Sequence, residues 1–206
     1  LLLENVRLQA GETMGNPGLV RALAAWGDVY INDAFSTAHR AHTSTTLLAH
    51  YFQDKLAGYL IQKELNSADK ILKGAKKPFV AIIGGAKISD KLQPLERLLD
   101  QLDYLLVGGG VANTFQRALG GQVGASLLEP DQVELAWKVA QKAQTKEVQL
   151  VLPADVVVSP RLEEVAEKRI VAGGTVPTGW MALDIGPKAR QEFSDIVQAA
   201  QTILWC

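Results

Sequence analysis

A short apolar strand that runs directly into a glycine turn constrains the fold of this chain more than any other feature. Residues 79–83 are continuously apolar, as expected of a strand that is covered on both faces of a parallel sheet. Gly84 and Gly85 follow it, and they allow the backbone to turn sharply close to a ligand. A helix is expected to begin just afterwards, so that its free N–H groups, Lys87 and Lys91 converge where anionic oxygens are favoured. The sequence therefore predicts a phosphate-binding turn, with an ordinary glycine-rich βα turn as the alternative.

Two common nucleotide-binding motifs do not fit these glycines. A P-loop needs a serine or threonine directly after its lysine, but Lys87 is followed by Ile88. The dinucleotide fingerprint needs a third glycine, and Asn113 occupies that position after the Gly108–Gly110 run. A binder of NAD or a sugar nucleotide is therefore the less favoured interpretation.

Length and composition limit the possible classes of protein. The 206 residues are 48% hydrophobic and 21% charged, which suits one large soluble domain or parts of two. A net charge of −1 gives no general attraction to nucleic acid or to acidic membranes, so neither is expected as a partner. One cysteine, Cys206, excludes an internal disulfide framework and favours the cytoplasm. The chain begins at Leu1 without a methionine, so a targeting segment upstream would not be visible.

Strand-like and helical patterns alternate along the chain, which predicts an α/β class with mainly parallel strands. Strands are expected at residues 1–3, 28–31, 79–83, 104–107, 149–152 and 202–205. Helices are expected at residues 17–26, 60–72, 94–101, 113–118, 131–146 and 187–200. Pro94 belongs in a first helical turn, which moves the start of its helix to about Leu92 or else kinks it. The long amphipathic helix that opens at residues 57–65 is either a rigid connector between domains or a helix packed within one.

Basic side chains follow the first two predicted strands. Arg7 and Arg40 would lie at the carboxyl ends of neighbouring strands, where two guanidinium groups can hold a phosphate or carboxylate in bidentate fashion. His39 and His42 are possible metal ligands, but no third ligand of matching spacing is evident. Imidazoles that face an anion are the favoured interpretation.

Six segments, taken in chain order, resemble phosphoglycerate kinase. Together they span nearly the whole chain, and they are residues 2–7 (LLENVR), 32–42 (NDAFSTAHRAH), 58–65 (GYLIQKEL), 84–91 (GGAKISDK), 107–115 (VGGGVANTF) and 179–187 (GWMALDIGP). The resemblance implies a monomeric, hinge-bending glycolytic enzyme, ATP:3-phospho-D-glycerate 1-phosphotransferase. This family transfers a phosphoryl group reversibly between 1,3-bisphosphoglycerate and Mg-ADP, giving 3-phosphoglycerate and ATP. Mg²⁺ would be carried with the nucleotide, and no metal ligand is assigned to the protein.

The resemblance also implies a domain organisation. Two Rossmann-like parallel-sheet domains of three α/β/α layers are expected, each only partly present, because the family's amino-terminal and carboxyl-terminal segments have no counterpart in this sequence. Residues 1–56 would belong to the domain that binds 3-phosphoglycerate, residues 57–72 to a connecting helix, and residues 73–206 to the nucleotide-binding domain. The alternative function is a catalytically incomplete fragment that binds nucleotide weakly.

By resemblance, individual residues acquire roles. Arg7, Arg40 and His39 would bind the glycerate, and Lys87 would follow the phosphoryl group during transfer. The residues expected to bind the nucleotide are Gly84, Gly85, Ala86, Lys87, Lys91, Gly108, Gly109, Leu127 and Ala182.

Two positions depart from the family pattern. Ala182 stands where the family usually has a glycine beside the base, so its methyl group is expected to narrow the adenine slot. Cys206 stands where an asparagine is usual.

Overall fold

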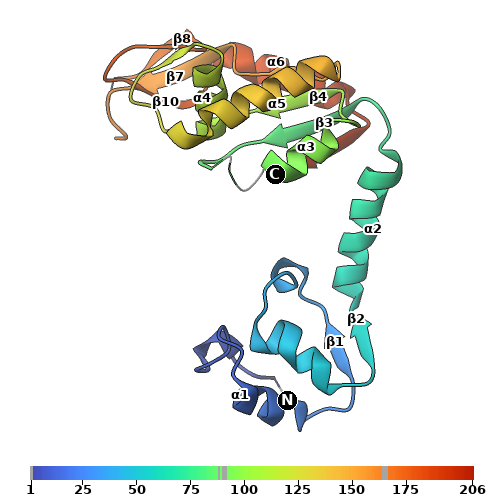
Figure 1. Ribbon diagram of the computed structural model, residues 1–206. Coiled ribbons are helices and arrows are strands. Elements are labelled where there is room, and N and C mark those ends of the chain that lie inside the picture. The colour runs from blue at the N-terminus through green and yellow to red at the C-terminus, as the bar shows by residue number, and fades with distance from the viewer. Residues whose placement is uncertain (1, 88, 90–91, 164–166) are drawn as a thin grey trace. The chain divides into compact units, whose positions relative to one another are not determined.

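The computed structural model describes residues 2–87, 89, 92–163 and 167–206. The chain divides into two compact units, Leu1–Gly74 and Ala75–Cys206, which appear in Figure 1 in blue to teal and in green to red. Each unit has its own parallel strands and its own candidate site. None of the helices within the described residues is long and apolar enough to span a membrane.

The first unit is built around a short parallel strand pair. Strands β1 (Tyr30–Asn32) and β2 (Lys55–Ala57) pair in parallel. Helix α1 (Pro17–Ala24) begins at a proline, and the side chain of Asn16 accepts hydrogen bonds from the N–H groups of Gly18 at 2.8 Å and Leu19 at 3.2 Å. Short helical turns at Val6–Leu8, Phe35–Thr37, Thr43–Leu47 and Leu48–Tyr51 complete the unit together with helix α2 (Tyr59–Gly74).

The start of α2 is fixed by an aspartate that follows β1. Asp33 Oδ1 accepts hydrogen bonds from the N–H groups of Leu60 at 2.7 Å and Ile61 at 3.0 Å, donors that a helix leaves unpaired in its first turn. Gly58 makes this possible, because a Cβ there would lie 2.3 Å from Asp33 Cγ. The Asp33 carboxylate can therefore bind the first turn of α2 only because position 58 has no side chain.

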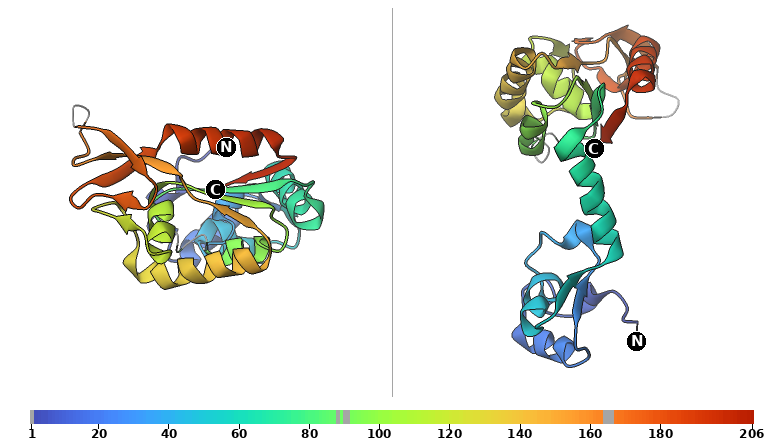
Figure 2. Two further views of the ribbon diagram at one scale, coloured as in Figure 1. Left: turned by 90° about the horizontal axis from the view of Figure 1, so that it is seen from above. Right: turned by 90° about the vertical axis from the view of Figure 1, so that its right-hand side faces the viewer.

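The second unit contains a four-stranded parallel sheet. Its strands lie in the order β11 (Thr202–Trp205), β3 (Phe79–Ile83), β4 (Tyr104–Val107) and β6 (Gln149–Val151). Helices α4 (Gly109–Ala118) and α5 (Val133–Thr145) pack against each other. Figure 2 shows α5 and α6 (Pro187–Ala199) on opposite faces of the sheet. Because helices cover both faces, Phe79, Val80, Leu105, Leu106 and Val107 are fully buried.

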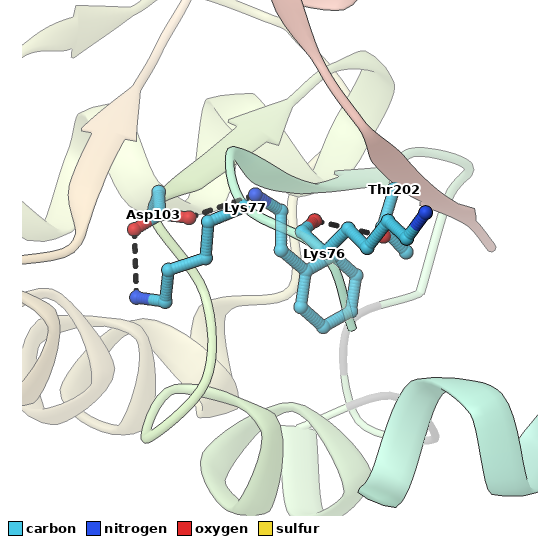
Figure 3. Close-up of polar contacts among 5 residues, drawn as sticks. Lys76, Lys77, Asp103 and Thr202 are labelled. Atoms are coloured by element: carbon cyan, nitrogen blue, oxygen red, sulfur yellow. Dashed lines mark hydrogen bonds and ion pairs between the residues drawn. The ribbon is translucent and has the colours of Figure 1, made fainter. Parts of the chain in front are cut away.

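The amino edge of this sheet is held by Asp103 (Figure 3). Its carboxylate accepts a hydrogen bond from the backbone N–H of Phe79 at 2.7 Å and from Lys77 Nζ at 2.8 Å. The Thr202 hydroxyl donates to the carbonyl of Lys76 at 2.8 Å. These contacts tie together the starts of β3, β4 and β11 at the edge opposite the glycine turn.

A second sheet of the same unit is antiparallel. Its order is β10 (Met181–Ile185), β7 (Asp155–Ser159) and β8 (Arg169–Ala172), and a smaller parallel pair is formed by β5 (Gln122–Val123) and β9 (Thr175–Val176). Its core is a cluster of Val156, Val158 and Val176. Asp155 also caps α6, since its carboxylate accepts the N–H groups of Ala189 at 2.8 Å and Lys188 at 3.2 Å.

The predicted α/β class is confirmed, and so are the exact limits of the strands at 79–83, 104–107 and 202–205. All the predicted helices are present with shifted ends. Helix α3 (Leu92–Leu98) begins at the residue indicated by Pro94, and α4 begins at Gly109 instead of residue 113.

Several strand predictions are wrong. Leu2 and Leu3 form no strand and are exposed, and Leu1, the first residue of that predicted strand, lies outside the described residues. The strand expected at residues 28–31 begins only at Tyr30. Strand β2 and the whole antiparallel sheet were not predicted from the sequence.

Candidate functional site

The glycine turn after β3 packs directly on the start of α4. The N–H of Gly108 donates to the carbonyl of Ile83 at 2.8 Å, and the N–H of Val111 donates to the carbonyl of Gly85 at 3.2 Å. Gly85 and Gly109 have positive φ angles of 95° and 61°, which favour glycine. A Cβ on Gly109 would lie 3.0 Å from the Gly85 carbonyl oxygen. The two glycine-rich segments therefore touch backbone to backbone at the carboxyl ends of β3 and β4.

A cavity of about 300 Å³ lies beside this contact, large enough for a planar heterocycle. It is bounded by the start of α4, by a loop at Leu127, and by strands β7 and β10. Its walls are mostly apolar, and they are formed by Gly109, Gly110, Ala112, Asn113, Leu127, Pro153, Val156, Leu162, Met181, Ala182, Leu183, Asp184 and Ile185. Such a lining favours a ligand held by shape and apolar contact.

Buried polar side chains hold the Leu127 loop in place. Asn113 Nδ2 donates to the carbonyl of Leu127 at 3.0 Å, and the N–H of Glu129 donates to Thr114 Oγ1 at 3.2 Å. The Ser126 hydroxyl oxygen accepts the N–H of Ala182 at 2.8 Å. Asn113, Thr114 and Ser126 are buried, so the loop is fixed from beneath.

These supporting residues were not predicted as part of a site. The only sequence signal was Asn113 and Thr114, two polar residues on an otherwise apolar stretch of a helix. Polar groups buried in that way need partners, and here the partners are the backbone groups of a cavity wall.

Lys87 follows the glycine turn after β3. Lys87 is exposed. Ser89 donates its hydroxyl to Glu129 Oε1 at 3.1 Å and its N–H to Glu129 Oε2 at 3.3 Å. The end of the turn is therefore tied to the same loop that carries Leu127. Lys91, predicted to bind the nucleotide, lies outside the described residues.

The structure divides the remaining predicted nucleotide residues into two groups. Gly109, Leu127 and Ala182 line the cavity. Gly84, Gly85, Ala86 and Gly108 lie on the adjoining turns. Ala182 also packs against the valine cluster of the antiparallel sheet, so it contributes to that core as well as to the cavity wall.

The first unit has a cavity of its own, of about 400 Å³. It brings together side chains that follow β1 and residues from the Thr43–Leu47 turn. The lining residues are Val6, Arg7, Glu12, Tyr30, Ile31, Asn32, Asp33, Ala34, Thr37, His42, Ser44 and Thr45. Of the predicted glycerate ligands, Arg7 lines this cavity, whereas His39 and Arg40 are exposed nearby in sequence and do not. His42 takes a place in the lining.

The acidic and basic groups of this cavity differ in how they are engaged. Glu12 accepts hydrogen bonds from Ser44, and Asp33 accepts the N–H groups at the start of α2. Within the described part of the chain, no hydrogen bond or ion pair involves the guanidinium groups of Arg7 or Arg40. The carboxylates are thus occupied internally and the arginines remain available for an anion.

Tyr30 connects β1 to the same turn. Its hydroxyl lies 3.0 Å from the carbonyl oxygen of Ser44 and 2.9 Å from that of Thr45. Partial burial raises the pKa of Tyr30 above its ordinary value, and the negative charge of Glu12 raises it further. The phenol therefore stays protonated and continues to donate at any physiological pH.

Metal binding by His39 and His42 finds no support in the described residues. Among them there is no group of three or more His, Cys, Asp or Glu side chains that could hold a metal ion. The interpretation of these imidazoles as groups facing an anion stays a prediction.

A parallel α/β sheet with a glycine turn and a cavity at the carboxyl ends of its strands defines a class of proteins that hold their ligands at that edge. The family model described as phosphoglycerate kinase matches residues 1–206. The chain belongs to the phosphoglycerate kinase family, as the six segments indicated.

Similar proteins have been described from several organisms. A phosphoglycerate kinase of Moorella thermoacetica is 48% identical over 205 residues, which are 100% of this chain and 52% of that protein. The protein named phosphoglycerate kinase 3, cytosolic, of Arabidopsis thaliana is 46% identical, with 100% and 51% covered. The solved phosphoglycerate kinase of Coxiella burnetii superposes with a TM-score of 0.84 at 39% identity, covering 98% of this chain and 52% of that one. The chain thus spans about half the length of the curated relatives it matches.

Proposed function

We propose that this chain is part of an enzyme that transfers a phosphoryl group reversibly between 1,3-bisphosphoglycerate and Mg-ADP, giving 3-phosphoglycerate and ATP. The observation that carries the proposal is the backbone contact between the two glycine turns beside the cavity of the second unit. That arrangement suits a nucleotide, and membership of the phosphoglycerate kinase family supplies the nature of the partner substrate.

The second unit is the proposed nucleotide site. The cavity of about 300 Å³ would take the adenine, with Leu127 and Ala182 on its walls. Glycines at 84, 85, 108 and 109 let the backbone approach the phosphates closely. Lys87, exposed after the turn, would follow the phosphoryl group, because a metaphosphate-like transition state needs cations on its equatorial oxygens.

The first unit is the proposed glycerate site. Arg7 on the cavity wall, with Arg40 and His39 on the neighbouring segment, would hold the phosphate and carboxylate of 3-phosphoglycerate. Engagement of Glu12 and Asp33 by backbone N–H groups supports this assignment, since it leaves the arginines unpaired by the neighbouring acids. The assignment of residues 1–56, 57–72 and 73–206 to glycerate domain, connecting helix and nucleotide domain stays part of the proposal.

Magnesium would arrive with the nucleotide. Mg²⁺ is commonly held by phosphate oxygens and water with few protein ligands. When bound, the ion would neutralise charge on the phosphates during transfer. The protein's own contribution is to orient the phosphates with the glycine turns and to place Lys87.

A second candidate function concerns the 206 residues by themselves. Because they span about half of their relatives' length, they are proposed to bind nucleotide weakly without catalysing transfer. The cytoplasm and a monomeric state are proposed for the whole protein, and a relative named as cytosolic supports the former.

The test uses the protein expressed from the full reading frame that contains this chain. A coupled assay should show ATP formation that depends on both ADP and 1,3-bisphosphoglycerate. Arg7→Ala should raise the glycerate KM by roughly tenfold to a hundredfold, the equivalent of one charge-assisted hydrogen bond, and leave nucleotide affinity nearly unchanged.

Arg21→Ala is the matched control, because Arg21 is an exposed arginine of α1 that does not line the cavity. It should leave the KM values of both substrates as they are. Absence of glycerate-dependent turnover in the parent protein would refute the proposed reaction. Equal losses of glycerate and nucleotide affinity in Arg7→Ala would refute the division of substrates between the units.

A further inference from the structure

Glu12 has a buried carboxylate that plays no part in the proposed phosphoryl transfer. Glu12 is only 2% exposed, yet it lines the same cavity as Arg7. Burying a carboxylate is costly unless it is hydrogen-bonded or paired. A negative charge at a cavity proposed to take an anion also repels that ligand. Its position therefore needs a reason other than direct contact with the substrate.

The carboxylate of Glu12 holds one residue of a distant turn. Glu12 Oε2 accepts the N–H of Ser44 at 3.1 Å, and Oε1 accepts the Ser44 hydroxyl. The backbone adds two further contacts: the N–H of Thr43 donates to the carbonyl of Glu12 at 2.8 Å, and the Thr43 hydroxyl donates to the carbonyl of Gly11 at 2.9 Å. Residues 11–12 therefore hold residues 43–44 through both side chains and backbone.

Hydrogen bonds to the carbonyl oxygen of Arg40 connect the residues around Ser44 to Arg40. This oxygen accepts the hydroxyl of Thr45 at 2.6 Å, the hydroxyl of Thr46 at 3.0 Å and the N–H of His42 at 2.9 Å. Segment 40–46 is thus closed onto itself by its own hydrogen bonds. Donors from residues 42, 45 and 46 share the carbonyl oxygen of Arg40. A contact that fixes Ser44 therefore also restricts the backbone at Arg40.

We propose that Glu12 is a positioning residue of the glycerate site, which fixes segment 40–46, and with it Arg40 and His42, relative to Arg7. The inference rests on the proposed function for the identity of the ligand, 3-phosphoglycerate. Placing two or three cations for one small anion requires a rigid arrangement, since a loose one loses affinity to the entropy of ordering the side chains. A fully hydrogen-bonded carboxylate supplies that rigidity, and the N–H and hydroxyl of Ser44 offset its charge.

Two substitutions separate the geometry of Glu12 from its charge. In Glu12→Gln the amide oxygen can still accept the Ser44 N–H, and the amide nitrogen can donate to the hydroxyl, which both donates and accepts. Glu12→Ala removes both contacts. In the protein from the full reading frame, Glu12→Ala should raise the glycerate KM about tenfold or more and change the KM for ATP less than about twofold. Glu12→Gln should recover most of the glycerate affinity, to within about threefold of the parent.

Asp103→Ala is the matched control. Asp103 is likewise a carboxylate that accepts a backbone N–H, but it lies in the second unit at the amino edge of the sheet (Figure 3). Its loss should lower the melting temperature and leave the KM values of both substrates unchanged. If Glu12 were merely structural, Glu12→Ala would behave in the same way, and the proposal would be overturned.

Hydrogen exchange gives a readout that needs no activity. Glu12→Ala should speed exchange of the Thr43 and Ser44 amides and of segment 40–46, and leave α1 protected. Unchanged exchange there would overturn the hold on the segment even if the parent enzyme is active. A parent without glycerate-dependent turnover would instead refute the proposed function, while faster exchange in the variant would still establish the hold.

Ser44→Ala covers the case in which Glu12→Ala fails to fold. It removes only the hydroxyl contact, so the N–H of Ser44 still reaches Glu12 Oε2. The expected rise in the glycerate KM is about threefold with the KM for ATP unchanged. An unchanged glycerate KM in a folded Ser44→Ala protein would count against the positioning role.

Discussion

Lys87 is the side chain on which the proposed transfer depends most. It is exposed at the end of the glycine turn, so it is free to follow a moving phosphoryl group. In the full-length protein, Lys87→Ala should lower kcat by about a hundredfold or more, the loss typical of one transition-state donor, and change the KM for ADP by less than about threefold. Steady-state kinetics at saturating glycerate would measure both constants.

Lys138→Ala serves as the comparison for that experiment. Lys138 is another exposed lysine of the second unit, paired with Glu134 at 2.6 Å on α5, and its loss should leave kcat unaltered. Parallel losses of kcat and ADP affinity in Lys87→Ala would show that the lysine contributes to ground-state binding and has no special part in the transfer.

The sequence identified the parts of the site that depend on local backbone chemistry. Gly85 was predictable because a sharp turn after a strand often needs a positive φ angle, here 95°, which favours glycine. Leu162 and Met181 were not predictable as walls of the same cavity, because they come from segments far along the chain. Glu12 escaped notice for a similar reason, since its partner Ser44 lies 32 residues away.

At the scale of elements, burial explains only part of what the sequence revealed, because the mostly buried β7 was missed whereas the half-exposed β11 was predicted. Strand β3 is buried on both faces, so its continuous apolar run was unambiguous. Strands β8 and β10 alternate irregularly between half-buried and exposed positions, and β10 carries an irregularity in its pairing with β7 between Ala182 and Asp184. Without a clean period of two, their pattern resembled loop.

The carboxylate of Asp103, which binds the start of β3, is expected to make the free energy of unfolding depend on pH. Partial burial acts to raise the pKa of Asp103, but the hydrogen bonds and charge from Lys77 and the N–H of Phe79 outweigh it and lower the pKa below that of an ordinary aspartate. The stabilisation is therefore fully present above the unfolded pKa of about 3.9 and is lost as the pH falls through the lower folded pKa. Asp103→Asn should lower the free energy of unfolding by about 1 kcal/mol at pH 7, with a smaller difference below pH of about 3.

Urea unfolding at the two pH values would measure that difference. Glu134→Gln is a suitable control, because the Lys138–Glu134 pair is exposed and such pairs add little stability. A destabilisation of Asp103→Asn that is equal at both pH values would mean that the ionised carboxylate is not what holds the strand.

The start of α2 provides a second test at this scale. Gly58→Ala would place a methyl group on the Asp33 carboxylate and release the N–H groups of Leu60 and Ile61, so the first unit should lose about 1 to 3 kcal/mol of stability. In an Asp33→Gly background, the same glycine substitution should cost much less, because the Asp33 carboxylate has gone together with the Cβ that would lie 2.5 Å from the new methyl group. Thermal unfolding of the single and double variants would give the coupling energy, and simple additivity would contradict the proposed contact.

At the scale of the whole molecule, the 206 residues by themselves are expected to bind ADP only weakly. The cavity offers mostly apolar contact for a base, and Lys87 is an exposed cation that is proposed to reach the phosphates. Affinity should be near millimolar, about −4 kcal/mol, without kinase turnover. Titration calorimetry of the purified chain would measure it, and micromolar Mg-ADP affinity or measurable turnover would show that these residues suffice for more than the proposal grants them.

The pairing of a capping aspartate with a glycine occurs in both units. Asp155 lies against Gly186 at the start of α6, where a Cβ would come within 2.2 Å of the carboxylate carbon, just as Asp33 lies against Gly58. Neither residue of such a pair can change freely by itself. A new side chain at the glycine displaces the acid, and at position 58 it would also lie 2.5 Å from the Cβ of residue 33. In related genes, positions 33 and 58, and likewise 155 and 186, should therefore change together or remain fixed together.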